Sequence, residues 1–106
     1  MSVQGAYYNW EWGYGGDNGG FGSLQLNFSP SDALAVVSLS NATGDGWCSA
    51  GFAQYTNTNS DQPYDLSWGL FGYPPMVRDT SMTSVTAGLS LGPNQTGVMT
   101  VLVWYL

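Results

Sequence analysis

The sequence predicts an all-β protein, either an antiparallel β-sandwich or a small barrel of about seven strands. Three observations lead to this prediction. Polar and apolar side chains alternate along most of the chain, clusters of Gly, Pro, Asn and Ser separate the alternating segments, and no segment keeps a helical period for longer than about one turn. The 106 residues suit a single domain with one hydrophobic core, which we place over residues 1–106.

The expected strands differ in how they bury their side chains. In 23–28 and 84–91 alternate residues are apolar, so each strand has one buried and one exposed face. The segment 98–106 is apolar almost throughout and suits a strand that is covered on both faces. The seven strands are expected at 7–12, 23–28, 33–40, 47–55, 65–71, 84–91 and 98–106. Their core is expected to contain Leu24, Leu26, Phe28, Leu89, Leu91, Val101 and Val103.

The residues between these segments predict how the strands are connected. A loop rich in Asn, Gly and Asp at 41–46 favours a hairpin of 33–40 with 47–55, and the turn at 92–95 favours a hairpin of 84–91 with 98–106. At 29–34 we expect one short helical turn, because Ser31 or Asp32 is suited to cap it. The glycine-rich stretch 13–22 is expected to be a long loop.

The C-terminal run also bears on association. Residues 98–106 contain no charged side chain, and an uncharged apolar edge strand pairs readily with another chain. The run is therefore expected to be either a central strand or a subunit interface. We expect a homo-oligomer on this basis.

The charge balance excludes several function classes. The chain contains seven Asp and Glu residues, no Lys and no His, and Arg78 is its one cation, so the net charge is −6. Such a chain does not neutralise a row of phosphates, which argues against nucleic acid as a partner, and it is not attracted to anionic membranes. Catalysis by a His- or Lys-activated nucleophile and His-liganded metals are excluded as well. No apolar stretch approaches the roughly 20 residues of a membrane helix, so membrane insertion is not expected.

Catalysis and cofactors are not expected. Glycoside hydrolysis requires two suitably spaced carboxyl groups, and Glu11 with Asp17, Asp45 or Asp61 would be such a pair. Any acidic chain offers one, however, and a domain this small is not expected to have a deep cleft. The prediction is a protein without enzymatic activity, without a cofactor and without a metal. Because no secretion signal is visible, we expect a soluble cytosolic protein, one released by lysis, or a component of a virion.

The densest feature is an aromatic segment near the N-terminus. In an extended strand Tyr8, Trp10, Trp12 and Tyr14 share one face, and Tyr7, Asn9 and Glu11 share the other. Flat aromatic rings stack on the C–H faces of sugars, and amides and carboxylates bond sugar hydroxyls. The alternative is that the rings form part of the core or a subunit contact. The predicted ligand-binding residues are Trp10, Trp12, Tyr14, Asn9, Glu11, Asp17 and Asn18.

A second polar and aromatic segment follows the fourth expected strand. Its alternate acidic and amide residues resemble the start of a calcium loop, but Gln62 and Trp68 stand where the essential Gly and Glu belong. It is therefore interpreted as a solvated loop whose amides bond their own backbone. The second-choice ligand loop comprises Tyr55, Asn57, Asn59, Asp61 and Tyr64.

The whole composition carries a resemblance. With its abundant Trp, Tyr, Asn, Gly and Asp and almost no cations, the chain resembles small soluble lectins. The same features resemble small β-rich virion proteins, such as capsid decoration or tail modules. The expected function is accordingly a non-catalytic, lectin-like module that binds a neutral glycan, and the alternative is a structural subunit of a virion or other extracellular assembly.

Overall fold

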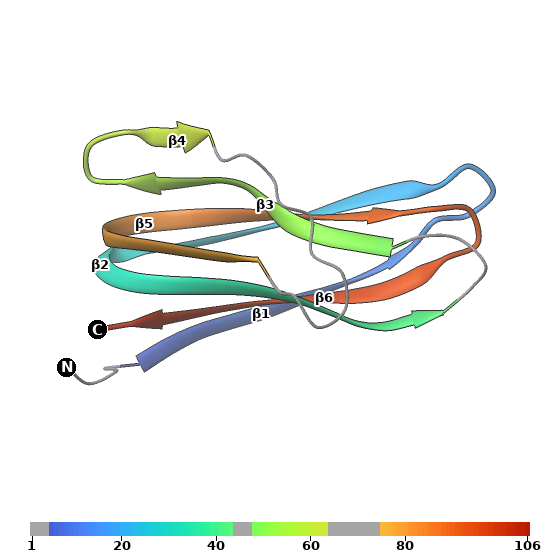
Figure 1. The fold of residues 1–106 in the computed structure, drawn as a ribbon, viewed down its shortest axis with the longest axis horizontal. Coiled ribbons are helices and arrows are strands. Elements are labelled where there is room, and N and C mark those ends of the chain that lie inside the picture. Colours follow the sequence, from blue (N-terminus) through green and yellow to red (C-terminus); the bar gives the residue numbers. More distant parts are fainter. Residues whose placement is uncertain (1–4, 44–47, 64–74) are drawn as a thin grey trace.

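The computed structural model describes residues 5–43, 48–63 and 75–106, and β-strands are the regular structure of this part of the chain (Figure 1). The strands are β1 (Gly5–Tyr14), β2 (Gly20–Thr43), β3 (Cys48–Asn57), β4 (Asp61–Pro63), β5 (Met76–Leu91) and β6 (Thr96–Tyr105). They form one antiparallel sheet in the order β1-β6-β2-β5-β3-β4. The predicted all-β antiparallel class is confirmed, whereas a sandwich or closed barrel of seven strands is not. Within the described ranges no helix is long and apolar enough to cross a membrane.

The long strand β2 replaces two of the predicted strands. It continues through 29–34, so the helical turn predicted there is wrong. Its pairing with β5 shifts register between Asn27 and Ser31 and again between Ser31 and Ala33. Pro30 has no N–H to contribute to a ladder, and a bulge is one of the few places where a sheet accepts proline. The irregular segment therefore bends the strand without ending it, and residues 33–36 beyond it pair with both β5 and β6.

Both predicted hairpins are wrong. β5 lies between β2 and β3, and β6 lies between β1 and β2, so the turn at 92–95 joins two strands that are not neighbours. The segment before 41–46 likewise pairs with β5 and β6 and not with β3. In the turn, Asn94 has a φ of 61° and the N–H of Gln95 donates to the carbonyl of Gly92. Turn chemistry fixes the local bend, but the burial of the strand faces decides which strands pair.

The connections bring the two halves of the sheet against each other. One half contains β1, β6 and the C-terminal part of β2, and the other contains the N-terminal part of β2 with β3 and residues 82–91 of β5. Residues 76–79 of β5 continue beside the C-terminal part of β2. Tyr7 of β1 stacks on Phe28 of β2, with ring centroids 5.3 Å apart, although these strands do not pair. A Cβ at Gly13 of β1 would lie 2.6 Å from Leu91 Cδ1 in β5. The inner faces of the two halves are therefore in direct contact.

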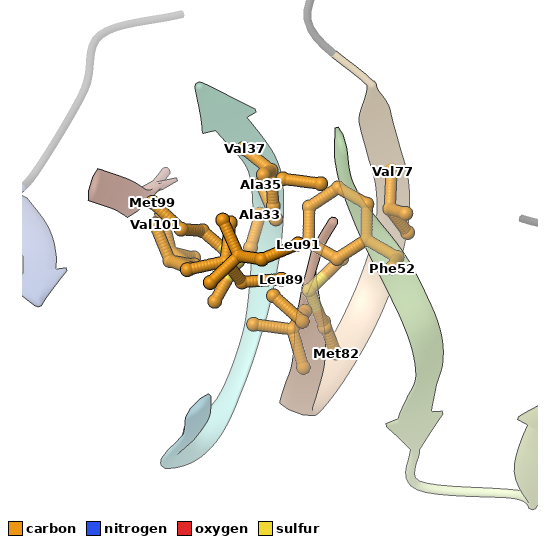
Figure 2. Packing of buried hydrophobic residues seen from close by; sticks show 14 residues of the cluster. Ala33, Ala35, Val37, Phe52, Val77, Met82, Leu89, Leu91, Met99 and Val101 are labelled. Atoms are coloured by element: carbon orange, nitrogen blue, oxygen red, sulfur yellow. The ribbon is translucent and has the colours of Figure 1, made fainter. Parts of the chain in front are cut away.

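The core lies between these inner faces. Figure 2 shows Phe52 of β3, Leu89 of β5 and Val101 of β6 gathered there, and all three are inaccessible to solvent. The predicted core residues Leu89, Leu91, Val101 and Val103 are buried, and Leu24, Leu26 and Phe28 pack against the core while partly exposed. The predicted alternation is thus confirmed in both halves.

The C-terminal run is a central strand, which is one of its two predicted places. Its inward side chains Met99, Val101 and Val103 are buried, while Leu102 and Trp104 are partly exposed on the other face. The expectation that both faces are covered is therefore wrong for this strand. The strand predicted at 65–71 lies outside the described residues.

Candidate functional site

The aromatic side chains Tyr8, Trp10, Trp12 and Tyr14, here called the aromatic stripe, lie in one row along β1. They are 62%, 55%, 56% and 54% exposed, respectively. β1 is at the end of the sheet order and pairs with β6 over its whole length without a register shift. The rings therefore belong to the surface of the single chain and not to its core.

The opposite face of β1 explains why the stripe points outward. Tyr7 packs on Phe28 and Tyr105, and Gly13 leaves room for Leu91. Since successive side chains of a strand alternate between faces, packing these residues inward places the rings of the stripe outward. The inner residues of β1 thereby determine the exposure of the outer ones.

The stripe borders further partly exposed side chains of the neighbouring strands. Trp12 lies opposite Val98 of β6, Tyr8 lies opposite Leu102, and Leu102 lies opposite Val36 of β2. Cross-strand partners share a face, so the surface beside the stripe is largely apolar. Its hydroxyl groups include those of Thr100 and Ser38, whose oxygens are 2.5 Å apart. Carboxylates are absent from these paired positions of β1, β6 and β2.

Asn9 and Glu11 are not brought together with the rings. Both side chains belong to the alternate set on β1, which lies on the face opposite the rings. The Oδ1 atom of Asn9 accepts a hydrogen bond of 2.9 Å from the backbone N–H of Trp10. Glu11 reaches over β2, where a Cβ at Gly22 would lie 3.5 Å from its Cγ. A ligand stacked on Trp10 and Trp12 therefore meets hydroxyl and indole N–H groups before it meets these two side chains.

A polar loop pair lies at the end of the stripe. The Tyr14 hydroxyl donates to Asn94 Oδ1 over 3.4 Å, and the Asn94 N–H donates to the Gly16 carbonyl over 2.7 Å. These bonds join the connection after β1 to the turn before β6. The predicted residues Asp17 and Asn18 follow in the same connection and are exposed. Sequence reasoning missed Asn94, although its place after Gly-Pro signalled a turn residue that tolerates positive φ.

The second-choice loop uses its polar groups internally. Asn57 Oδ1 accepts from the backbone N–H groups of Asn59 and Ser60 at 2.9 and 2.8 Å, and Asn57 Nδ2 donates to Asp79 over 3.2 Å. The predicted bonding of an amide to its own backbone is confirmed for Asn57, but the segment is not a loop throughout, because Tyr55 and Asn57 belong to β3 and Asp61 to β4, which pair as a hairpin. Asn59 is exposed, whereas Tyr64 and the side chain of Asp61 lie outside what the structure describes.

Asp79 holds this loop against β5. The Ser81 N–H donates to its carboxylate over 2.9 Å, and this bond is the main reason that the pKa of Asp79 lies below its ordinary value. Partial burial opposes the shift, and hydrogen bonds from Asn57, Tyr55 and the Ser81 hydroxyl add to it. These contacts indicate a structural role for Asp79.

Arg78 and Cys48 are two further side chains that could take part in chemistry, and both contact neighbouring strands. Arg78 forms an ion pair with Asp32, which joins β5 to β2 beside the bulge. Burial raises the pKa of the Cys48 thiol. A Cβ added to Gly97 of β6 would lie 2.6 Å from Cys48 Sγ, so the thiol packs closely against that strand. In residues 5–43, 48–63 and 75–106 no three His, Cys, Asp or Glu side chains cluster as a metal site would require.

Comparisons with known proteins assign no family to the chain. No protein-family model matches the sequence, and a search of curated proteins finds no match.

Proposed function

We propose that the protein is a non-catalytic module that binds a neutral glycan along the aromatic stripe. The observation that carries the proposal is the row of four rings on one strand, each more than half exposed. Alternate residues of a strand are about 6.8 Å apart, so consecutive rings of the stripe are spaced for an extended ligand lying along β1. A chain of sugar rings is such a ligand.

The chemistry of the stripe supports an uncharged ligand. Trp and Tyr have apolar faces for stacking and N–H or O–H groups for sugar hydroxyls. The Tyr14 end adds the Asn94 side chain, and Asp17 and Asn18 follow in the adjoining connection. With a net charge of −6, the protein would repel an anionic polysaccharide.

A second candidate is a structural subunit of an assembly. It is favoured by the apolar side chains that continue the surface from the stripe to Leu102 and Val36, because proteins bury such surfaces against one another. This candidate predicts assembly through the stripe without any response to sugar.

Native gel electrophoresis through soluble neutral polysaccharides tests the proposal. We expect at least one of them to retard the wild-type protein, and the Trp10→Ala and Trp12→Ala variants to be retarded less while still melting cooperatively. Phe21→Ala is the matched control, since Phe21 is 65% exposed on the other half of the sheet. Unaltered migration of the wild-type protein in every polysaccharide would contradict the proposal, and self-association lost in both Trp variants would favour the assembly candidate.

A further inference from the structure

Among the described strands β1 pairs with β6 alone, and its other edge differs from the opposite end of the sheet. β4, at that other end, has three residues and includes Pro63, and short edge strands with proline resist pairing with another chain. β1 has ten residues, no Pro, no Lys and no bulge in its pairing with β6. Among the described residues, β1 therefore lacks the proline, lysine and bulge that protect many edge strands, and Glu11 is its one charged side chain.

One hydrogen bond identifies which backbone groups point outward from this edge. The N–H of Trp10 donates to Asn9 Oδ1 within the same strand, so it does not take part in the ladder to β6. In an antiparallel ladder the N–H and C=O of one residue point to the same neighbouring strand. The outward groups therefore belong to alternate residues, namely Ala6, Tyr8, Trp10, Trp12 and Tyr14.

We propose that β1 pairs antiparallel with β1 of a second copy, about a two-fold axis at Trp10. In this register Trp10 lies opposite its own counterpart and Tyr8 lies opposite Trp12 of the second copy. All of these residues have outward N–H and C=O groups, and pairing exchanges the bond from the Trp10 N–H to Asn9 Oδ1 for one to the second copy. It also places aromatic side chains opposite each other on the outer face, where such cross-strand pairs are favourable.

The opposite face of β1 favours this register over the neighbouring one centred on Glu11. Asn9 lies opposite Glu11 of the second copy, so an amide donor meets a carboxylate, and Tyr7 lies opposite the small Gly13. A register shifted by one residue on each strand, centred on Glu11, would instead place the two Glu11 carboxylates opposite each other, and like charges across a ladder are unfavourable. Glu11 is the one charged side chain of β1, so the net charge of −6 opposes this contact little.

The inference goes beyond the proposed function and does not depend on a glycan. Side chains stand roughly perpendicular to a sheet, so pairing at the edge leaves the outer faces of the rings open. The two aromatic stripes would then form one continuous surface across the two-fold axis. A dimer that binds no glycan would refute the proposed function and leave the strand pairing intact.

Sedimentation equilibrium of the full chain without sugar tests the pairing. We expect a wild-type dimer, a dissociation constant at least tenfold higher for Asn9→Glu, and recovery of the dimer in the double variant Asn9→Glu/Glu11→Lys, in which opposite charges face each other again. Asn27→Glu, at an exposed position of β2 away from the edge, is the matched control and should dimerise as the wild type does. Circular dichroism verifies that each variant folds.

Two results would overturn the inference. One is a wild-type protein that stays monomeric at every concentration. The other is a dimer whose dissociation constant does not respond to Asn9→Glu, because the interface would then lie elsewhere on the molecule.

Discussion

Replacing Gly13 by Ala tests which face of β1 packs inward. A Cβ at this position would lie 2.6 Å from Leu91 Cδ1 and 2.9 Å from Leu89 Cδ2, so both side chains must shift, and both are buried in the core. Overpacking of this kind costs about 1–3 kcal/mol. If Gly13 faced solvent, the same replacement would stabilise the strand by roughly 0.5–1 kcal/mol, because glycine loses more backbone entropy on folding. The two arrangements therefore predict opposite signs.

The expected change in melting temperature follows from the length of the chain. An unfolding entropy of about 2.1 cal/mol/K per residue gives roughly 0.22 kcal/mol/K for this protein, so 1 kcal/mol corresponds to about 4–5 °C. Gly13→Ala should thus lower the melting temperature by about 5–13 °C, measured by calorimetry or circular dichroism.

Gly22→Ala is the matched control for this measurement. The nearest atom to a Cβ at Gly22 is Glu11 Cγ at 3.5 Å, which is an ordinary contact, so the variant should melt at the wild-type temperature or slightly above it. Shortening the clashing side chain with Leu91→Val should recover part of the loss from Gly13→Ala, with a coupling of about 0.5–3 kcal/mol. A higher melting temperature for Gly13→Ala would refute the inward packing of this face and, with it, the outward direction of the stripe.

Three further predictions concern the core, the acid response and the thiol. Phe52→Ala, at a fully buried position, should cost about 3–5 kcal/mol, whereas Phe21→Ala should change stability by less than about 1 kcal/mol in denaturant titrations; equal losses would contradict the assigned core. Because folding lowers the pKa of Asp79, its stabilising contribution is present above the unfolded value of about 3.9 and is lost as the pH falls through the folded pKa. Asp79→Asn should therefore be less stable than wild type at neutral pH, with a gap that closes below about pH 4, and a gap independent of pH would refute the role of its charge. Since burial raises the pKa of Cys48, its alkylation at mildly alkaline pH should be slower in the folded protein than in urea, and equal rates would show an open thiol.

The inward and outward faces of the strands were predictable because they depend on local alternation. Strand bounds were predicted less well, since β1 and β2 extend into the stretch 13–22 that was expected to be a loop, and β2 continues through 29–34. The alternation around Leu24, Leu26 and Phe28 and the alternation in 84–91 correctly identified the inward faces. The alternation of side chains in 7–12 correctly placed the rings of the stripe on the face opposite Tyr7 and Glu11. Each of these assignments needs only the two-residue period of a strand.

Strand partners were not predictable from the same information. The turn at 92–95 has the composition of a hairpin loop, yet β5 and β6 are not neighbours, because they pair with opposite edges of β2. The bulge around Ser31 also concealed the continuity of β2, because Ser29 to Asp32 has the composition of a helix start. These outcomes depend on contacts between residues that are distant in the sequence.

The candidate site was predictable in part for the same reason. The four rings were identified from sequence, but Asn9 and Glu11 were grouped with them by proximity along the chain, whereas strand parity places those side chains on the other face. Asn94 and Thr100 reach the surface of the stripe from the far end of the sequence. The pairing register of β1 with β6 must be known before Asn94 and Thr100 can be assigned to this surface.

Calorimetric titration of the best-retained neutral polysaccharide into wild type and the Trp10→Ala/Trp12→Ala variant tests the proposed role of the stripe most directly. If a sugar covers about 50 Å² of each ring and hides as much of its own apolar surface, each lost ring costs up to ~2.5 kcal/mol. We therefore expect a dissociation constant at least tenfold higher for the double variant, with a cooperative melting transition retained and with Phe21→Ala unchanged. Equal affinity of the double variant and the wild type would contradict the assignment of the aromatic stripe as the binding surface.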